Sequence, residues 1–150
     1  MGKRGFTLIE ILVVIAIIGI LSATAVRAYN FYRQRSTGAE ASVIIKNLLE
    51  HEIMYFLEND EYFPAPGDIL EVYKAGTTLH NGAPSATVIQ DITDALNVEI
   101  SVRHNLDFQI RNFPDNTLQI WIIAPFAIFN TFPNDRIGAQ MDKSGKITWL

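Results

Sequence analysis

The feature that most constrains this chain is an uncharged, mostly aliphatic run near its amino terminus, from Ile11 to Val26. As a helix, the stretch from Phe6 to Val26 would be about 31 Å long, close to the thickness of a bilayer's hydrocarbon core. Lys3 and Arg4 precede the stretch and Arg27 follows it. The run therefore predicts a membrane-spanning helix, and the positive-inside tendency places its Lys3–Arg4 end in the cytoplasm.

Glu10 is a single acid at the start of this apolar helix. A carboxylate in apolar surroundings costs several kcal/mol unless it is protonated or paired, and no Lys or Arg lies one helical turn beyond it. A cut between Gly5 and Phe6 would create a new α-amine on Phe6. We expect that amine to pair with Glu10, in the same helix or in one packed alongside.

The residues that lead into the run are Lys3-Arg4-Gly5-Phe6-Thr7-Leu8-Ile9-Glu10. Residues 2–30 resemble the class III leader and amino-terminal helix of type IV pilins and pseudopilins. The resemblance implies that a prepilin peptidase cuts after Gly5 and that Phe6 is N-methylated. It also implies that Glu10 pairs with the amino terminus of a neighbouring subunit during assembly into a helical homopolymer. The other implied partner is an inner-membrane assembly platform.

The implied function is that of a structural subunit of a type IV pilus, supporting adhesion, twitching motility or DNA uptake. The precursor would lie in the inner membrane and the assembled filament outside the cell. The five-residue leader resembles the type IVa subclass, but Arg27 stands where many major pilins carry a proline. Without that proline a kink is not expected, and Gly19 remains the weak point, at roughly 1 kcal/mol relative to Ala. This difference favours a minor or unusual pilin.

Four other interpretations stay open at this level. One is a pseudopilin of a type II secretion system, working in the periplasm, and another is a membrane-anchored binding domain that never polymerises. An ordinary signal peptide would use Ala23-Thr24-Ala25 as its cleavage site. A plain single-pass anchor explains the length of the run but not Glu10. The amino terminus of the mature protein separates the cleavage alternatives: methylated Phe6, Val26 or Met1.

The predicted fold is α+β, a long amino-terminal helix packed against an antiparallel sheet of three or four strands. We expect a leader (1–5), an apolar assembly helix (6–30) and a globular domain (31–150), the last comprising helix 31–58, a loop region 59–97 and a sheet 98–150. Apolar residues recur at three- and four-residue steps within 31–58, which predicts one buried stripe. The stripe residues are Ala41, Ile44, Ile45, Leu48, Leu49, Ile53, Phe56 and Leu57, with Glu40, Lys46, Asn47, Glu50 and Glu52 mostly opposite.

Local patterns predict the smaller elements. Within 59–97 we expect a short helix at 69–74 capped by Asp68, a loop at 76–85 and a second helix at 86–97. Alternation predicts strands at 106–111 and 118–124. A second hairpin, at 136–141 and 146–149, is predicted around a turn at 142–145.

Nothing in the composition predicts catalysis, a cofactor or a metal. The net charge of −4, which becomes −6 once Lys3 and Arg4 are removed, does not suit nucleic acid, and there are no cysteines. The three histidines, His51, His80 and His104, share no metal-ligand spacing, and His51 is expected on a solvated face. Asp135 and Asp142 are the residues to inspect for calcium, although a tight turn explains Asp142 better. Tyr29, Phe31 and Tyr32 suit an interfacial aromatic belt.

Overall fold

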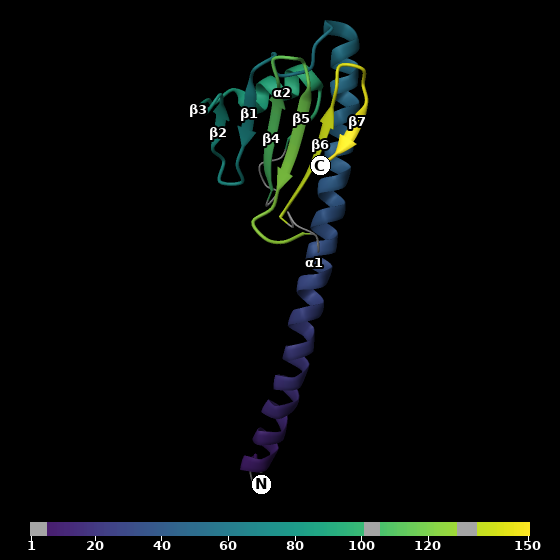
Figure 1. Cartoon of the computed structure of the whole chain (residues 1–150). Helices are drawn as coiled ribbons and strands as arrows, with labels where there is room; N and C mark the ends of the chain where they lie inside the picture. Colours follow the sequence, from purple (N-terminus) through teal and green to yellow (C-terminus); the bar gives the residue numbers. More distant parts are fainter. Residues whose placement is uncertain (1–5, 101–105, 129–134) are drawn as a thin grey trace.

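A computed structural model describes residues 6–100, 106–128 and 135–150. One helix, α1 (Leu8–Asn59, 52 residues), forms a rod about 78 Å long, and a globular domain packs against its carboxyl-terminal half (Figure 1). The helix passes through Gly19, Arg27 and Gly38 without interruption. The predicted long helix against an antiparallel sheet is confirmed.

The sheet is fully antiparallel, with the strand order β3-β2-β1-β4-β5-β6-β7. The prediction of three or four strands is therefore too low. The strands are β1 (Ile69–Val72), β2 (Thr78–His80), β3 (Ala83–Pro84), β4 (Asp107–Asn112), β5 (Leu118–Ile123), β6 (Arg136–Met141) and β7 (Ile147–Trp149).

The short helix predicted at 69–74 is wrong, because this segment is strand β1. Leu70 and Val72 point into the core while their neighbours are half-buried, which is the two-residue period of a strand. Asp68 does not cap a helix, since its carboxylate binds His80 and Asn81 instead. Strands β2 and β3 occupy the predicted loop at 76–85. The second helix is confirmed as α2 (Val88–Leu96).

The core lies between one face of the sheet and the two helices. Helix α2 contacts α1, β1 and β2, and buries Val88, Ile92 and Leu96. The central strands contribute side chains that are essentially inaccessible to solvent: Phe108, Ile110, Leu118, Ile120, Ile122, Ala139 and Met141. From α1 the buried side chains are Ala41, Ile45, Leu48, Leu49 and Glu52.

Two residues in the carboxyl-terminal half of α1, Leu57 and Glu52, lie on the opposite side of the helix from the one predicted. Leu57 is 77% exposed although Phe56 of the same turn packs against the core, because its helical position lies on the exposed side with Glu50, seven residues earlier. Glu52, predicted on the solvent side, is fully buried. It is three residues from Leu49 and four from Leu48 and Phe56, so its helical position is on the stripe.

On the opposite face of the sheet, Trp121 of β5 lies over Gly138 of β6, its cross-strand partner. A Cβ atom at position 138 would be 2.5 Å from the Cε3 atom of Trp121. Only glycine allows the indole ring to lie this close to the backbone of β6.

Candidate functional site

The amino terminus of α1 holds the residues on which the sequence analysis depends. Phe6 is 82% exposed and lies just ahead of the helix, while Glu10 is in its first turn. Thr7 caps the helix: its hydroxyl accepts from the Glu10 amide at 3.4 Å. The Glu10 atom Oε2 accepts in return from the Thr7 amide (2.8 Å) and hydroxyl (2.7 Å). Gly5, the other side of the expected cleavage point, lies outside the described residues.

Thr7 is a contributor that the sequence reasoning missed. The spacing Thr7-x-x-Glu10 is a capping box, in which the two side chains satisfy amide groups that a helix start leaves open. Both donors use Oε2 of Glu10. The second oxygen, Oε1, accepts from no group in the part of the chain that the structure describes. Glu10 is thus held by its own helix and keeps one oxygen for another donor.

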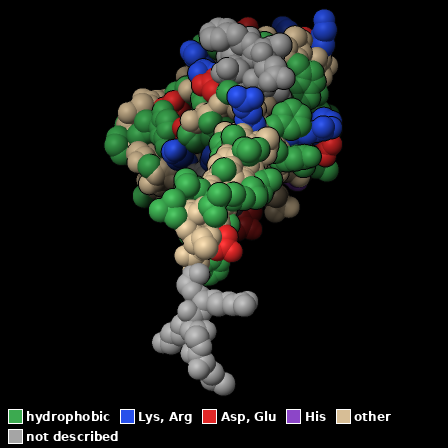
Figure 2. All heavy atoms as spheres, turned by 90° about the horizontal axis from the view of Figure 1, so that it is seen from below, with side chains coloured by type: hydrophobic (Ala, Val, Ile, Leu, Met, Phe, Trp, Pro, Cys, Tyr) green, Lys and Arg blue, Asp and Glu red, His purple; other side chains and the backbone are tan. Residues whose placement is uncertain are grey.

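Every residue from Phe6 to Arg33 is exposed, although this half of α1 is mostly apolar. It contains the one helix stretch, within the described ranges, that is long and apolar enough to cross a membrane, and none of that stretch is buried. Figure 2, which views the molecule from the amino-terminal end of the rod, shows hydrophobic side chains gathered on this surface. The hydroxyl of Thr24 donates to the Leu21 carbonyl at 2.9 Å, so even this polar group is satisfied within the helix.

Aromatic residues mark the end of the exposed half. Tyr29, Phe31 and Tyr32 are exposed, and the rings of Phe31 and Tyr32 meet edge to face with their centroids 5.9 Å apart. The guanidinium carbon of Arg33 then lies 4.1 Å from the ring centroid of Phe126, between β5 and β6. This contact is where the rod meets the domain.

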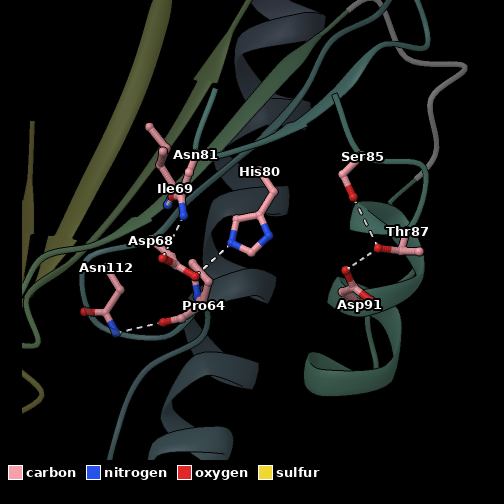
Figure 3. A network of polar contacts seen from close by, with 9 residues as sticks. All are labelled: Pro64, Asp68, Ile69, His80, Asn81, Ser85, Thr87, Asp91 and Asn112. Atoms are coloured by element: carbon pink, nitrogen blue, oxygen red, sulfur yellow. Dashed lines mark hydrogen bonds and ion pairs between the residues drawn. The ribbon is translucent and has the colours of Figure 1, made fainter. Parts of the chain in front are cut away.

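The described histidines make local contacts. His51 is half-buried, with Nδ1 2.8 Å from the Asn47 carbonyl oxygen. His80 Nε2 lies 2.8 Å from Asp68 Oδ2, and Asn81 donates to Asp68 Oδ1 at 2.9 Å (Figure 3). These two hydrogen bonds lower the pKa of Asp68, and the bond from Asn81 has the larger effect. They fix the β1–β2 corner. His104 lies outside the described residues.

Neither acid singled out for calcium lies in a cluster of ligands. Across residues 6–100, 106–128 and 135–150, no three His, Cys, Asp or Glu side chains are placed to share a metal ion. Asp135 pairs with Arg136 at 2.9 Å. Asp142 accepts from the amides of Ser144 and Lys146 at 2.8 and 3.1 Å, which holds the turn between β6 and β7. The predicted tight turn is confirmed.

A second group of polar side chains lies deep in the domain, where the chain leaves α1. We call Glu52, Asn112 and Asn116 the corner clamp; Oδ1 of Asn116 accepts from the Tyr62 amide at 3.1 Å. Oε2 of Glu52 accepts from the Phe63 amide at 3.0 Å, and Nδ2 of Asn112 donates to the Tyr62 and Pro64 carbonyls at 2.8 and 2.9 Å. Backbone groups of three consecutive residues are thus bound by side chains from α1 and β4.

The corner clamp also contains unpaired acceptors. Within the described chain, Oε1 of Glu52 and Oδ1 of Asn112 are buried without a hydrogen-bond partner. Burial raises the pKa of Glu52 well above its usual range, and the hydrogen bond from Phe63 opposes this rise only in part. Glu52 was predicted on the solvent side because acids are usually solvated. The three- and four-residue spacing to Leu48, Leu49 and Phe56 is the signal that identifies it.

Comparison with known proteins bears on the amino-terminal segment. The family described as "Prokaryotic N-terminal methylation motif" matches residues 1–26. The type IV major pilin protein PilE1 of Neisseria gonorrhoeae is 32% identical over 96 residues, which cover 58% of each chain. The type IV major pilin protein PilA of Myxococcus xanthus is 44% identical over 60 residues, covering 40% of this chain and 27% of that protein.

A third relative matches a shorter segment with a higher sequence identity. The type IV major fimbrial protein FimA of Dichelobacter nodosus is 60% identical over 38 residues, about a quarter of each chain. This chain spans between about a quarter and somewhat over half of the length of these curated relatives. No solved structure matches it. The leader motif, the relatives and the long helix against an antiparallel sheet all agree with the predicted resemblance: this chain is similar to type IV pilins and carries a leader like their class III leader.

Proposed function

We propose that this protein is a structural subunit of a type IV pilus filament. One observation carries the proposal: an apolar half-helix with no buried residue is joined, in one continuous rod, to a folded domain. Such a surface is stable in a bilayer or against other apolar helices, and a filament core supplies the second environment. The names of the relatives, which are major pilins and fimbrial proteins, favour a pilus over a secretion pseudopilin.

The first proposed step is maturation in the inner membrane. The chain divides into a leader (1–5), an assembly helix (6–30) and a globular domain (31–150) on the far side of the membrane. A prepilin peptidase cuts between Gly5 and Phe6 and N-methylates Phe6. Removal of Lys3 and Arg4 with the leader takes away the cationic tip, and the cut creates a single cation, the Phe6 amine, beside Glu10.

The second proposed step is registration in the growing filament, at an inner-membrane assembly platform. The Phe6 amine of one subunit binds Glu10 of its neighbour through the oxygen that Thr7 leaves free. A buried ion pair adds little net stability, but one unpaired member costs about 3–5 kcal/mol. Aliphatic helices slide past each other readily, so this penalty selects one register. The finished filament extends outward from the cell surface.

The proposal is tested by examining sheared surface material from cells that produce the wild-type chain, Glu10→Ala or Glu10→Gln. We expect wild-type fibres whose subunit begins at N-methylated Phe6 by mass spectrometry. Both variants should be cut and methylated normally but yield at least tenfold fewer fibres by electron microscopy. Glu58→Gln, an exposed acid elsewhere on α1, is the matched control and should assemble normally. Mature protein that begins at Val26 or Met1, or an absence of fibres from the wild type, would contradict the proposal.

A further inference from the structure

Filament geometry requires two different docking patches on each subunit. Copies related by a rotation and a translation that do not close into a ring meet through heterologous contacts, in which one patch binds a different patch of the next copy. This inference rests on the proposed function. It concerns the globular domain rather than the apolar helix.

The first patch is the β7 edge of the sheet. The two outer strands differ: β3 is two residues long and contains Pro84, which has no N–H to offer a partner, whereas β7 is open. Ile147, Trp149 and Leu150 are 39%, 47% and 47% exposed. An exposed apolar edge strand is a template for association, and folded proteins usually shield one.

A groove runs between this edge and α1. It has a volume of about 270 Å³. Its lining is mainly apolar, with one lysine and one glutamate on the helix side. The lining residues are Lys46, Leu49, Glu50, Ile53, Ile147 and Trp149. We call these residues, together with Lys143 and Lys146 of the adjoining turn, the edge patch.

The charge of the edge patch identifies its complement. Residues 143–150 contain Lys143 and Lys146 and no Asp or Glu. Residues 75–100 contain Asp91, Asp94 and Glu99 and no Lys or Arg. Asp91 and Asp94 lie on the exposed side of α2, opposite its buried residues, and we call them with Gln90 the α2 face. The edge patch thus has three lysines and one glutamate beside its apolar side chains, and the α2 face is acidic.

The two patches lie at opposite ends of the domain and cannot meet within one copy. Helix α2 contacts β1 and β2, whereas β7 is the last strand at the other end of the sheet (Figure 1). We propose that the edge patch of one subunit binds the α2 face of the next, so that Lys143 and Lys146 meet Asp91 and Asp94 while the β7 edge is covered. Repetition of this contact joins the domains around the filament.

A charge exchange tests the pairing in full-length chains. Lys143→Glu/Lys146→Glu makes both patches acidic, and Asp91→Lys/Asp94→Lys makes both basic. We expect each variant alone to give at least tenfold fewer sheared fibres than the wild type. Cells that produce both variants should recover at least half of the wild-type yield, because each altered patch then has an opposite partner. Lys74→Glu, an exposed lysine on the β1–β2 turn, should assemble normally.

Folding and direct contact are checked separately. The thermal unfolding of each variant in detergent is measured by circular dichroism. If Asp91→Lys unfolds α2 by removing the hydrogen bond from Thr87, the charge exchange is repeated with Asp91 intact. In that version Lys146→Glu changes the edge patch and Asp94→Lys changes the α2 face. Because the chain has no cysteine, Lys146→Cys/Asp94→Cys should give a ladder of disulfide-linked multimers in oxidised fibres, and Lys74→Cys/Asp94→Cys should not.

The outcomes distinguish the two proposals. Folded variants that assemble alone like the wild type, or that fail to recover when mixed, overturn the patch pairing and leave the pilus function standing. A wild-type chain that forms no fibres overturns both.

Discussion

The two halves of α1 are both rich in apolar side chains, yet one half is entirely exposed and the other is covered by a sheet. The difference is in the spacing. Residues 11–26 are apolar on every side, whereas in residues 41–56 the apolar positions form one stripe with charged residues opposite. A stripe can be covered by one sheet, but a helix that is apolar all round needs lipid or other helices on every side. The same rod therefore serves two environments.

The largest expected contrast comes from removing one large side chain in each half. Leu48→Ala leaves a cavity in the core and should lower the free energy of unfolding by about 2–5 kcal/mol. Leu12→Ala, at a residue 51% exposed, should change it by less than about 0.5 kcal/mol. Denaturant unfolding in detergent measures both. Equal losses would mean that the exposed half belongs to the same cooperative unit as the domain.

A pH titration of stability separates the buried acid from its exposed neighbour. Because burial raises the pKa of Glu52, folding favours its protonated form. Its contribution to stability is therefore greatest below its unfolded pKa, near 4.5, and falls as the pH rises towards the raised value in the folded state.

Glu52→Gln keeps an acceptor for the Phe63 amide and should remove this pH dependence, making the domain more stable than the wild type at pH 7. Glu50→Gln, one residue away and exposed, should leave the pH profile unchanged. Thermal unfolding from pH 4 to pH 9 provides the measurement. A variant that is less stable than the wild type at neutral pH would show that the ionised carboxylate is the native form.

Replacing two glycines with alanine should have opposite effects on stability. Gly138→Ala places a methyl group against Trp121 and should cost about 1–3 kcal/mol. Gly19→Ala meets no atom within 4 Å and should favour the helix by up to about 1 kcal/mol. Denaturant unfolding reports the first change and helix content in detergent reports the second. A neutral Gly138→Ala would show that the indole ring moves aside freely.

The smallest expected effect is at the helix start. Thr7→Ala removes the capping box and should cost about 1 kcal/mol, seen as fraying of the first turn in amide hydrogen exchange. Thr7→Ser should retain the bonds and the protection. Unchanged exchange in Thr7→Ala would mean that Glu10 alone holds the first turn.

Sequence reasoning found the elements whose pattern runs through several residues. The helix stripe and the strands β4, β5 and β6 each extend over at least six residues, enough for their period to be read. Strands β1, β2 and β3 are four, three and two residues long, and β1 is defined by its pairing with β4, which sequence spacing does not express.

The site was predicted in part for similar reasons. Glu10 stood out because an acid in an apolar run is costly, but its bonds with Thr7 depend on where the helix begins. Glu52 was assigned to the solvent side because it is an acid, although its spacing places it on the stripe; its bond with Phe63 depends on a corner whose path follows from the whole domain. The Phe6–Glu10 pair between subunits stays a prediction.

The placement of the two tryptophans has a practical consequence. Trp121 is clamped over Gly138 inside one subunit, whereas Trp149 is 47% exposed on the open edge. These are the only indoles in the chain, so they provide two intrinsic fluorophores with different surroundings. Polymerisation that covers the edge should shift the emission of Trp149 to shorter wavelengths and leave that of Trp121 unchanged, allowing assembly to be followed in real time without an added dye.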